Sequence, residues 1–182
     1  MCGGYISVTY GYSLRGNEGL WVDAERLIEG IDIGRNPTHE RTHVIVSLLG
    51  RFKGEDGDRM HVFPLATTTK SGVRIRMWLE RVSNLLRHEG KKNCPAFCDV
   101  DSYLMSKKTF EAVFHPILEE IQETQGNRGL IPPGLEVKEN YYCFRSFRRG
   151  AEIEALNNEI DPNTIAFVHR WSKFEKSRGV EP

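Results

Sequence analysis

Residues 42–66, THVIVSLLGRFKGEDGDRMHVFPLA, contain two apolar stretches on either side of a turn-forming segment. Thr42 to Leu49 is rich in β-branched and aliphatic residues, and Arg59 to Ala66 is a second short apolar stretch that contains a proline. Gly50 to Asp58 lies between them and has glycines and acidic residues, a composition typical of turns. The pattern predicts a β-hairpin.

Four helices are predicted after the hairpin. Val73 to His88 carries apolar residues at helical spacing, and a second helix begins at Ser106. A third runs from about Ser146 to Asn157, and a fourth begins at Asp161-Pro162, where Asp is a good N-cap and Pro suits the first helical position. The apolar positions of the first two helices are Ile75, Trp78, Leu79, Val82, Leu85 and Leu86, and then Phe110, Val113, Phe114, Ile117, Leu118 and Ile121.

The segment before the hairpin completes the expected fold. Trp21 to Ile33 contains a weakly alternating run, which predicts a third strand. Gly126 to Glu136, with its glycines and prolines, is interpreted as a linker or a crossing loop. We therefore expect a mainly helical α+β fold in which a small three-stranded antiparallel sheet packs on a helical bundle, formed by a single domain over residues 1–182.

Composition limits the class of protein and partner. The 182 residues are 39% hydrophobic and 27% charged, with 25 basic and 25 acidic side chains, which describes a globular chain. No charged leader precedes an apolar run and no stretch is long enough to span a bilayer, so we expect an intracellular protein without membrane insertion. Because the net charge is zero, any DNA-binding surface must be a local patch, and residues 51–92 have an excess of basic side chains.

Neither the cysteines nor the histidines indicate a metal site or a bound cofactor. Cys94 and Cys98 form a single C-x3-C pair without a second ligand pair, so ordinary reduced thiols are the simpler interpretation. His39 and His43 stand four residues apart, but their context suggests a loop that enters a strand rather than one helical face.

Arginine and lysine residues lie before the expected sheet, in the hairpin turn and at the start of a late helix. An arginine precedes the sheet, in Leu-Arg-Gly-Asn-Glu, and a lysine lies in the hairpin turn. Further arginines open a late helix, and a His-Arg-Trp-Ser segment follows about twenty residues later. The candidate site residues are Arg15, Lys53, Arg145, Arg148 and Trp171, with Glu18, His169 and Arg149 as secondary candidates.

In this order and placement the residues resemble the tyrosine recombinase (phage-integrase-like) family, over residues from about 10 to 175. The resemblance implies that Arg15 and Arg148 are the two catalytic arginines, Lys53 the hairpin lysine, and Trp171 the residue at the family's His/Trp position. Segments 50–55 and 146–150, Gly-Arg-Phe-Lys-Gly-Glu and Ser-Phe-Arg-Arg-Gly, look closer to recombinase-like domains of eukaryotic mobile elements than to bacterial integrases.

Two positions depart from the family pattern. Arg145 stands where the family most often has histidine, which puts the general-base or orienting role of that position in doubt. The family nucleophile is a tyrosine located C-terminal to the His/Trp position, and Ser172 to Pro182 contains none. We therefore expect a truncated catalytic core that is inactive by itself.

The chemistry of strand cleavage explains why these residue types suit such a site. Negative charge develops on the nonbridging oxygens of an attacked phosphodiester, and guanidinium groups such as those of Arg15 and Arg148 can meet it bidentately. Lys53 is the candidate acid for the departing 5′ oxygen. Trp171 or His169 can donate an N–H or pack the site, and a tyrosine would conserve the bond energy as a phosphotyrosine.

Three functions remain open on the sequence. The first is DNA cleavage and rejoining in recombination or integration, with this chain as a fragment of the enzyme. The second is a catalytically inert DNA-binding remnant of a mobile element, and the third an unrelated interaction module whose arginines are ordinary surface charges. The first two predict double-stranded DNA as partner, a homo-multimer on DNA, and a nuclear location in a eukaryotic host.

Overall fold

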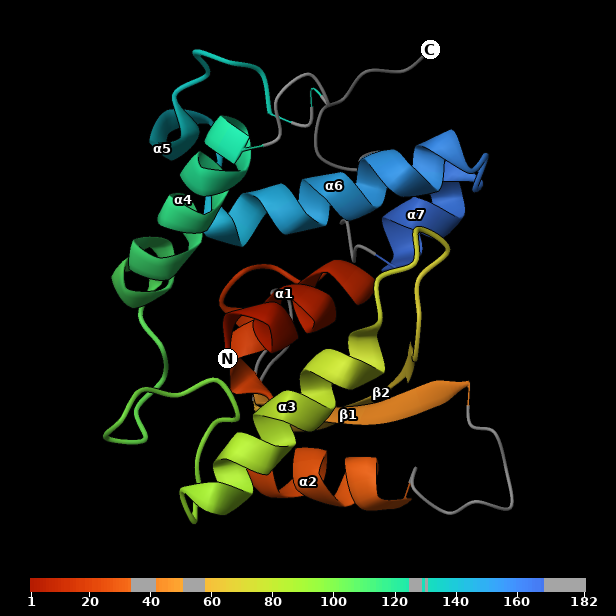
Figure 1. Ribbon diagram of the computed structural model, residues 1–182. Helices are drawn as coiled ribbons and strands as arrows, with labels where there is room; N and C mark the ends of the chain where they lie inside the picture. Colours follow the sequence, from red (N-terminus) through yellow and green to blue (C-terminus); the bar gives the residue numbers. More distant parts are fainter. Residues whose placement is uncertain (34–41, 51–57, 125–128, 130, 169–182) are drawn as a thin grey trace.

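The computed structural model describes residues 1–33, 42–50, 58–124, 129 and 131–168. Its described elements form a mainly helical α+β arrangement, with a two-stranded antiparallel hairpin packed against helices (Figure 1). In chain order they are α1 (Cys2–Gly11), the 3-10 helix η1 (Glu18–Trp21), α2 (Ala24–Ile33), β1 (His43–Gly50), β2 (Arg59–Ala66), α3 (Ile75–His88), α4 (Lys107–Thr124), α5 (Val137–Asn140), α6 (Cys143–Asn157) and α7 (Pro162–Val168).

The hairpin expected from residues 42–66 is confirmed. Strands β1 and β2 pair antiparallel, from His43 opposite Ala66 to Gly50 opposite Arg59. On one face, Val44, Val46 and Leu48 are buried, because this face lies against the hydrophobic core.

The predicted third strand is wrong. Trp21 to Ile33 contributes a single bridge to β1, in which the backbone N–H of Asp23 donates to the Ser47 carbonyl at 3.0 Å. The Asp23 side chain then accepts from the Arg26 N–H at 2.8 Å, which satisfies a free donor in the first turn of α2. The buried residues in this segment follow helical spacing rather than alternation, and they are Ala24, Leu27, Ile28 and Ile31.

The helices predicted after the hairpin are confirmed, with small shifts at their starts. α3 begins at Ile75, α4 at Lys107 and α6 at Cys143. Asp161 occupies the predicted cap position of α7, where its carboxylate accepts from the Thr164 N–H at 2.9 Å. Of the described helices, none is both long and apolar enough to cross a membrane.

Helix α1 was not predicted, and it lies at the centre of the fold between α3 and α6 (Figure 1). Its sequence, CGGYISVTYG, has glycines and β-branched residues, which are poor helix formers. Small residues permit close packing here, since a Cβ atom at Gly4 would lie 2.6 Å from a Val82 methyl carbon. Tyr5 is fully buried and stands edge-on to Phe97 and Phe110. Tertiary packing thus overrides low helix propensity.

Candidate functional site

Arg15 lies in a tightly held loop between α1 and η1. Ser13 adopts a positive φ of 52°, which reverses the chain, and Leu14 is fully buried. The Tyr5 hydroxyl of α1 donates to the carbonyl of Gly16 at 2.7 Å. Because both neighbours of Arg15 are fixed, the arginine is presented from a defined backbone position.

Glu18 holds Arg15 from the first turn of η1. Its side chain is only 5% exposed, and its Oε2 accepts from the Arg15 backbone N–H at 2.7 Å. The guanidinium Nη1 lies 3.6 Å from Oε1, which is an ion-pair distance. A buried carboxylate is tolerated when it is paired in this way. The structure therefore explains the Leu-Arg-x-x-Glu spacing as an orienting contact.

The Arg15 side chain is 32% exposed, although its Nη1 atom is itself buried. Among the described residues, no group accepts a hydrogen bond from this nitrogen. The ion pair with Glu18 is therefore the contact of this buried nitrogen, and the exposed part of the Arg15 side chain lies on its other atoms.

The second group of arginines lies on α6, which packs on α1 (Figure 1). Arg148 is half-buried, whereas Arg145 and Arg149 are exposed. The ring of Phe147 stands 6.4 Å from the ring of Tyr5, measured between centroids. The Tyr5 ring thus contacts Phe147, which precedes Arg148, and its hydroxyl donates a hydrogen bond to Gly16, which follows Arg15. The structure brings together the neighbours of the two arginines through one buried side chain.

Three predicted site residues lie outside the described residues. They are Lys53 in the hairpin turn, and His169 and Trp171 after α7. Of the remaining candidates, Arg15 and Glu18 are in contact, and Arg145, Arg148 and Arg149 share the first half of α6. The expectation that the cationic side chains converge on one face therefore remains a prediction.

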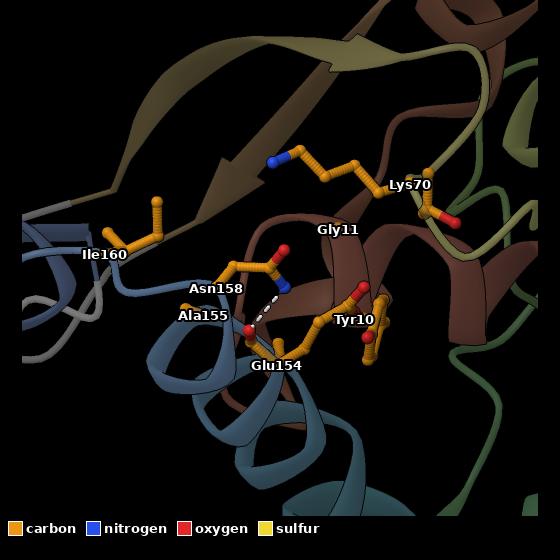
Figure 2. Close-up of a pocket in the computed structure, with 9 residues that line it drawn as sticks. Tyr10, Gly11, Lys70, Glu154, Ala155, Asn158 and Ile160 are labelled. Carbon is orange, nitrogen blue, oxygen red and sulfur yellow. Dashed lines mark hydrogen bonds between the residues drawn. The ribbon is translucent and has the colours of Figure 1, made fainter.

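An open pocket of about 260 Å³ lies next to the end of α1 and was not predicted from the sequence. Figure 2 shows Tyr10 entering it from α1, Lys70 from the turn after β2, and Glu154 with Asn158 from the end of α6. The Asn158 amide donates to the Glu154 carbonyl at 2.8 Å. No local motif marks these residues, because the pocket forms only where three distant segments meet.

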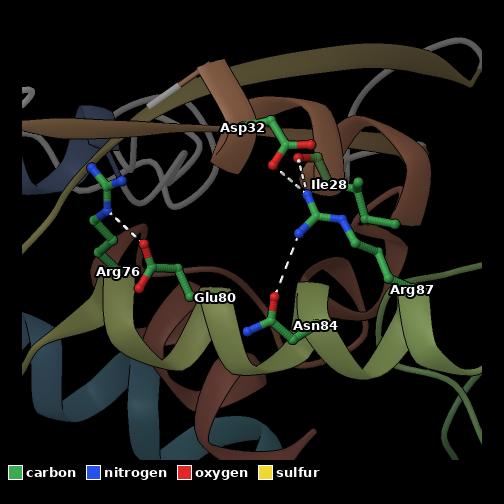
Figure 3. A network of polar contacts seen from close by, with 6 residues as sticks. All are labelled: Ile28, Asp32, Arg76, Glu80, Asn84 and Arg87. Carbon is green, nitrogen blue, oxygen red and sulfur yellow. Dashed lines mark hydrogen bonds and ion pairs between the residues drawn. The ribbon is translucent and has the colours of Figure 1, made fainter. Parts of the chain in front are cut away.

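Part of the basic excess in residues 51–92 is neutralised locally (Figure 3). Arg76 pairs with Glu80 one turn later on α3, at 2.9 Å. Arg87 reaches α2, where it pairs with Asp32 at 2.5 Å. These arginines act within the fold, so the count of basic residues overstates the charge available to a DNA partner.

The described residues contain no cluster of three or more His, Cys, Asp or Glu side chains that could hold a metal ion. A scan against protein-family models gives no match, and comparisons with curated proteins and with solved structures give no significant match. The functional argument therefore rests on the residues and geometry of this chain.

Proposed function

We propose that this chain binds double-stranded DNA through a phosphate clamp formed by Arg15 and Arg148, within a catalytic core of the tyrosine recombinase type. The reaction of that family is strand cleavage and rejoining through a 3′-phosphotyrosine. Residues 172–182 contain no tyrosine, so the proposal for residues 1–182 is binding and orientation of the scissile phosphate. Covalent attack requires a tyrosine from outside the site described above.

One observation carries the proposal: Tyr5 links the loop of Arg15 to the α6 turn of Arg148. Its hydroxyl bonds Gly16 at 2.7 Å and its ring packs against Phe147. A phosphate clamp needs two guanidinium groups on rigid supports, since a flexible arginine loses side-chain entropy on binding. A buried tyrosine between two supports provides that rigidity.

The electrostatics of the Arg15 loop agree with phosphate binding. Glu18 is buried and holds the Arg15 backbone, while the Arg15 side chain is 32% exposed through atoms other than the buried Nη1. A phosphate oxygen accepts charge-assisted hydrogen bonds from guanidinium donors, often two at once.

The test is DNA binding at several salt concentrations. A fluorescently labelled duplex is titrated with protein from about 50 to 200 mM salt, and affinity is read by anisotropy. Arg15→Gln and Arg148→Gln are each expected to weaken binding by roughly tenfold and to reduce the salt slope by about one. Arg26→Gln is the matched control, because Arg26 is exposed on α2, away from α6 (Figure 1).

Circular dichroism of each variant checks that the fold is retained, which matters for Arg15 because its loss leaves buried Glu18 without its ion pair. Affinities of Arg15→Gln and Arg148→Gln equal to that of Arg26→Gln would overturn the clamp. Absence of wild-type binding at 50 mM salt would overturn DNA as the partner and favour the interaction-module interpretation.

A further inference from the structure

The pocket of about 260 Å³ at the end of α1 is lined by segments that hydrogen bonds hold in place. Lys70 follows Thr69, whose N–H donates to the Val73 carbonyl at 3.0 Å and whose hydroxyl accepts from the Val73 N–H at 3.0 Å. At the end of α6, the Ile160 N–H donates to the Ala155 carbonyl at 3.1 Å. Because the backbone on both segments is fixed, the pocket does not need a ligand in order to form.

Groups of three kinds line this pocket (Figure 2). Tyr10 supplies an aromatic ring, and Ile160 an aliphatic surface that is 41% exposed. Lys70 supplies a positive charge. Asn158 supplies a side-chain oxygen that can accept a hydrogen bond, while its amide nitrogen donates to the Glu154 carbonyl at 2.8 Å. A complementary ligand therefore has a flat apolar body, an N–H donor and a separate negative charge.

Arg148 lies on the same face of α6 as the pocket. Ala151 and Ala155 line the pocket, and Arg148 precedes Ala151 by three residues, which is nearly one helical turn. This spacing is about 4.5 Å along the helix axis, close to the roughly 3.4 Å between successive nucleotides of a DNA strand. A Cβ atom at Gly150 would stand 3.6 Å from a Tyr10 ring carbon, so α1 and α6 are in contact here. A phosphate bound by Arg148 would thus place the next nucleotide near the pocket.

We propose that this pocket binds one nucleotide unit, a nucleoside 5′-monophosphate that is either free or part of a DNA strand. The Tyr10 ring stacks on the base, the Asn158 side-chain oxygen accepts from a base N–H, and the Lys70 ammonium contacts the phosphate. Guanine suits this arrangement because its amino group is a donor. The DNA source rests on the proposed function, since the Arg148 clamp brings the strand to the pocket. An unpaired base enters at a lower cost than a paired one, so single-stranded DNA is the better DNA source.

The test begins with titration of the whole folded chain with deoxyguanosine 5′-monophosphate, followed by two-dimensional amide NMR. Saturable shifts are expected at the amides of Tyr10, Lys70 and Asn158. Tyr10→Leu and Lys70→Gln are each expected to weaken this binding by roughly fivefold or more, through loss of stacking and of the charged contact. Lys92→Gln is the matched control, because Lys92 is exposed in the segment between α3 and α4. Circular dichroism checks that each variant is folded.

A labelled single-stranded oligonucleotide then distinguishes the two sources of the nucleotide, with affinity read by anisotropy. If the nucleotide is part of DNA, Tyr10→Leu weakens binding of the strand as well; if it is free, Tyr10→Leu weakens binding of the monophosphate alone. Arg148→Gln is expected to leave affinity for the monophosphate unchanged, so failure of the clamp is seen only in the DNA titrations. Absence of saturable shifts, or equal monophosphate affinity of wild type, Tyr10→Leu and Lys70→Gln, would overturn the pocket while leaving the clamp intact.

Discussion

Gly30→Ala should destabilise the protein although alanine is the better helix former. Gly30 lies within α2, and a Cβ atom there would stand 2.7 Å from the backbone carbonyl oxygen of Ile45 in β1. Carbon–oxygen contacts normally begin at about 3.3 Å, so α2 must withdraw from β1 by roughly 0.6 Å. A backbone oxygen in a paired strand cannot rotate away as a side chain would.

The magnitude follows from two opposing effects. Replacing glycine by alanine inside a helix stabilises it by about 1 kcal/mol. Overpacking costs about 1–3 kcal/mol. Part of this cost is lost dispersion energy, because separating α2 from β1 by roughly 0.6 Å removes a quarter or more of the attraction between the atoms moved apart. The contacts at risk include those of Leu27 and Ile31, which are buried on the same helix. The overpacking cost exceeds the gain in helix propensity, and we expect a net loss of up to about 2 kcal/mol in the free energy of unfolding.

The same substitution at Gly150 is the matched control. Gly150 lies within α6, and a Cβ atom there would stand 3.6 Å from a Tyr10 ring carbon, an ordinary contact. Gly150→Ala should therefore stabilise the protein by up to about 1 kcal/mol. Urea unfolding followed by circular dichroism measures both variants, with the m-value as a check on two-state behaviour. A gain in stability for Gly30→Ala equal to that of Gly150→Ala would refute the packing argument.

Three further predictions concern single side chains. Glu18→Gln should lower stability by about 1–3 kcal/mol and weaken DNA binding, since it removes the charge paired with Arg15; unchanged urea midpoint and affinity would contradict this. Because the folded-state pKa of Cys98 is raised from 9.0 to about 11, its contribution to stability is complete below pH 9 and is lost as pH rises toward 11. The fall in melting temperature over that range should be smaller in Cys98→Ala. Asp161→Ala should cost about 1 kcal/mol by removing the cap on the Thr164 N–H, and Asp161→Asn, which keeps an acceptor, should cost less in the same urea titration.

Local patterns predicted much of the fold. The β-branched apolar stretches and turn residues of 42–66 identified the hairpin, and helical spacing identified α3 and α4. The sequence of α2 contained the correct signal as well, in Asp23 as a cap and in buried residues at helical spacing. A third strand was predicted because apolar residues also fall at alternate positions over part of that segment.

The candidate site was predicted in part. The Leu-Arg-x-x-Glu spacing selected Arg15 and Glu18, and the structure pairs their side chains. Arg148 was selected by its place in a late helix, and the packing of Phe147 on Tyr5 connects that helix to the Arg15 loop. The role of Tyr5 had no signal in the sequence, because a buried tyrosine in a glycine-rich segment resembles any core residue.

The sequence by itself determined the hairpin and the helices that follow it, α3, α4, α6 and α7, because their patterns are encoded in neighbouring residues. Only the tertiary structure decided that CGGYISVTYG is a helix, since its propensity is low and its stability comes from contacts with α3 and α6. It also decided that a side chain has no room at Gly4, which faces a Val82 methyl carbon, or at Gly30, which faces the Ile45 carbonyl oxygen, because these are distances between segments far apart in the chain. Such distances depend on how whole faces pack, which no local pattern records.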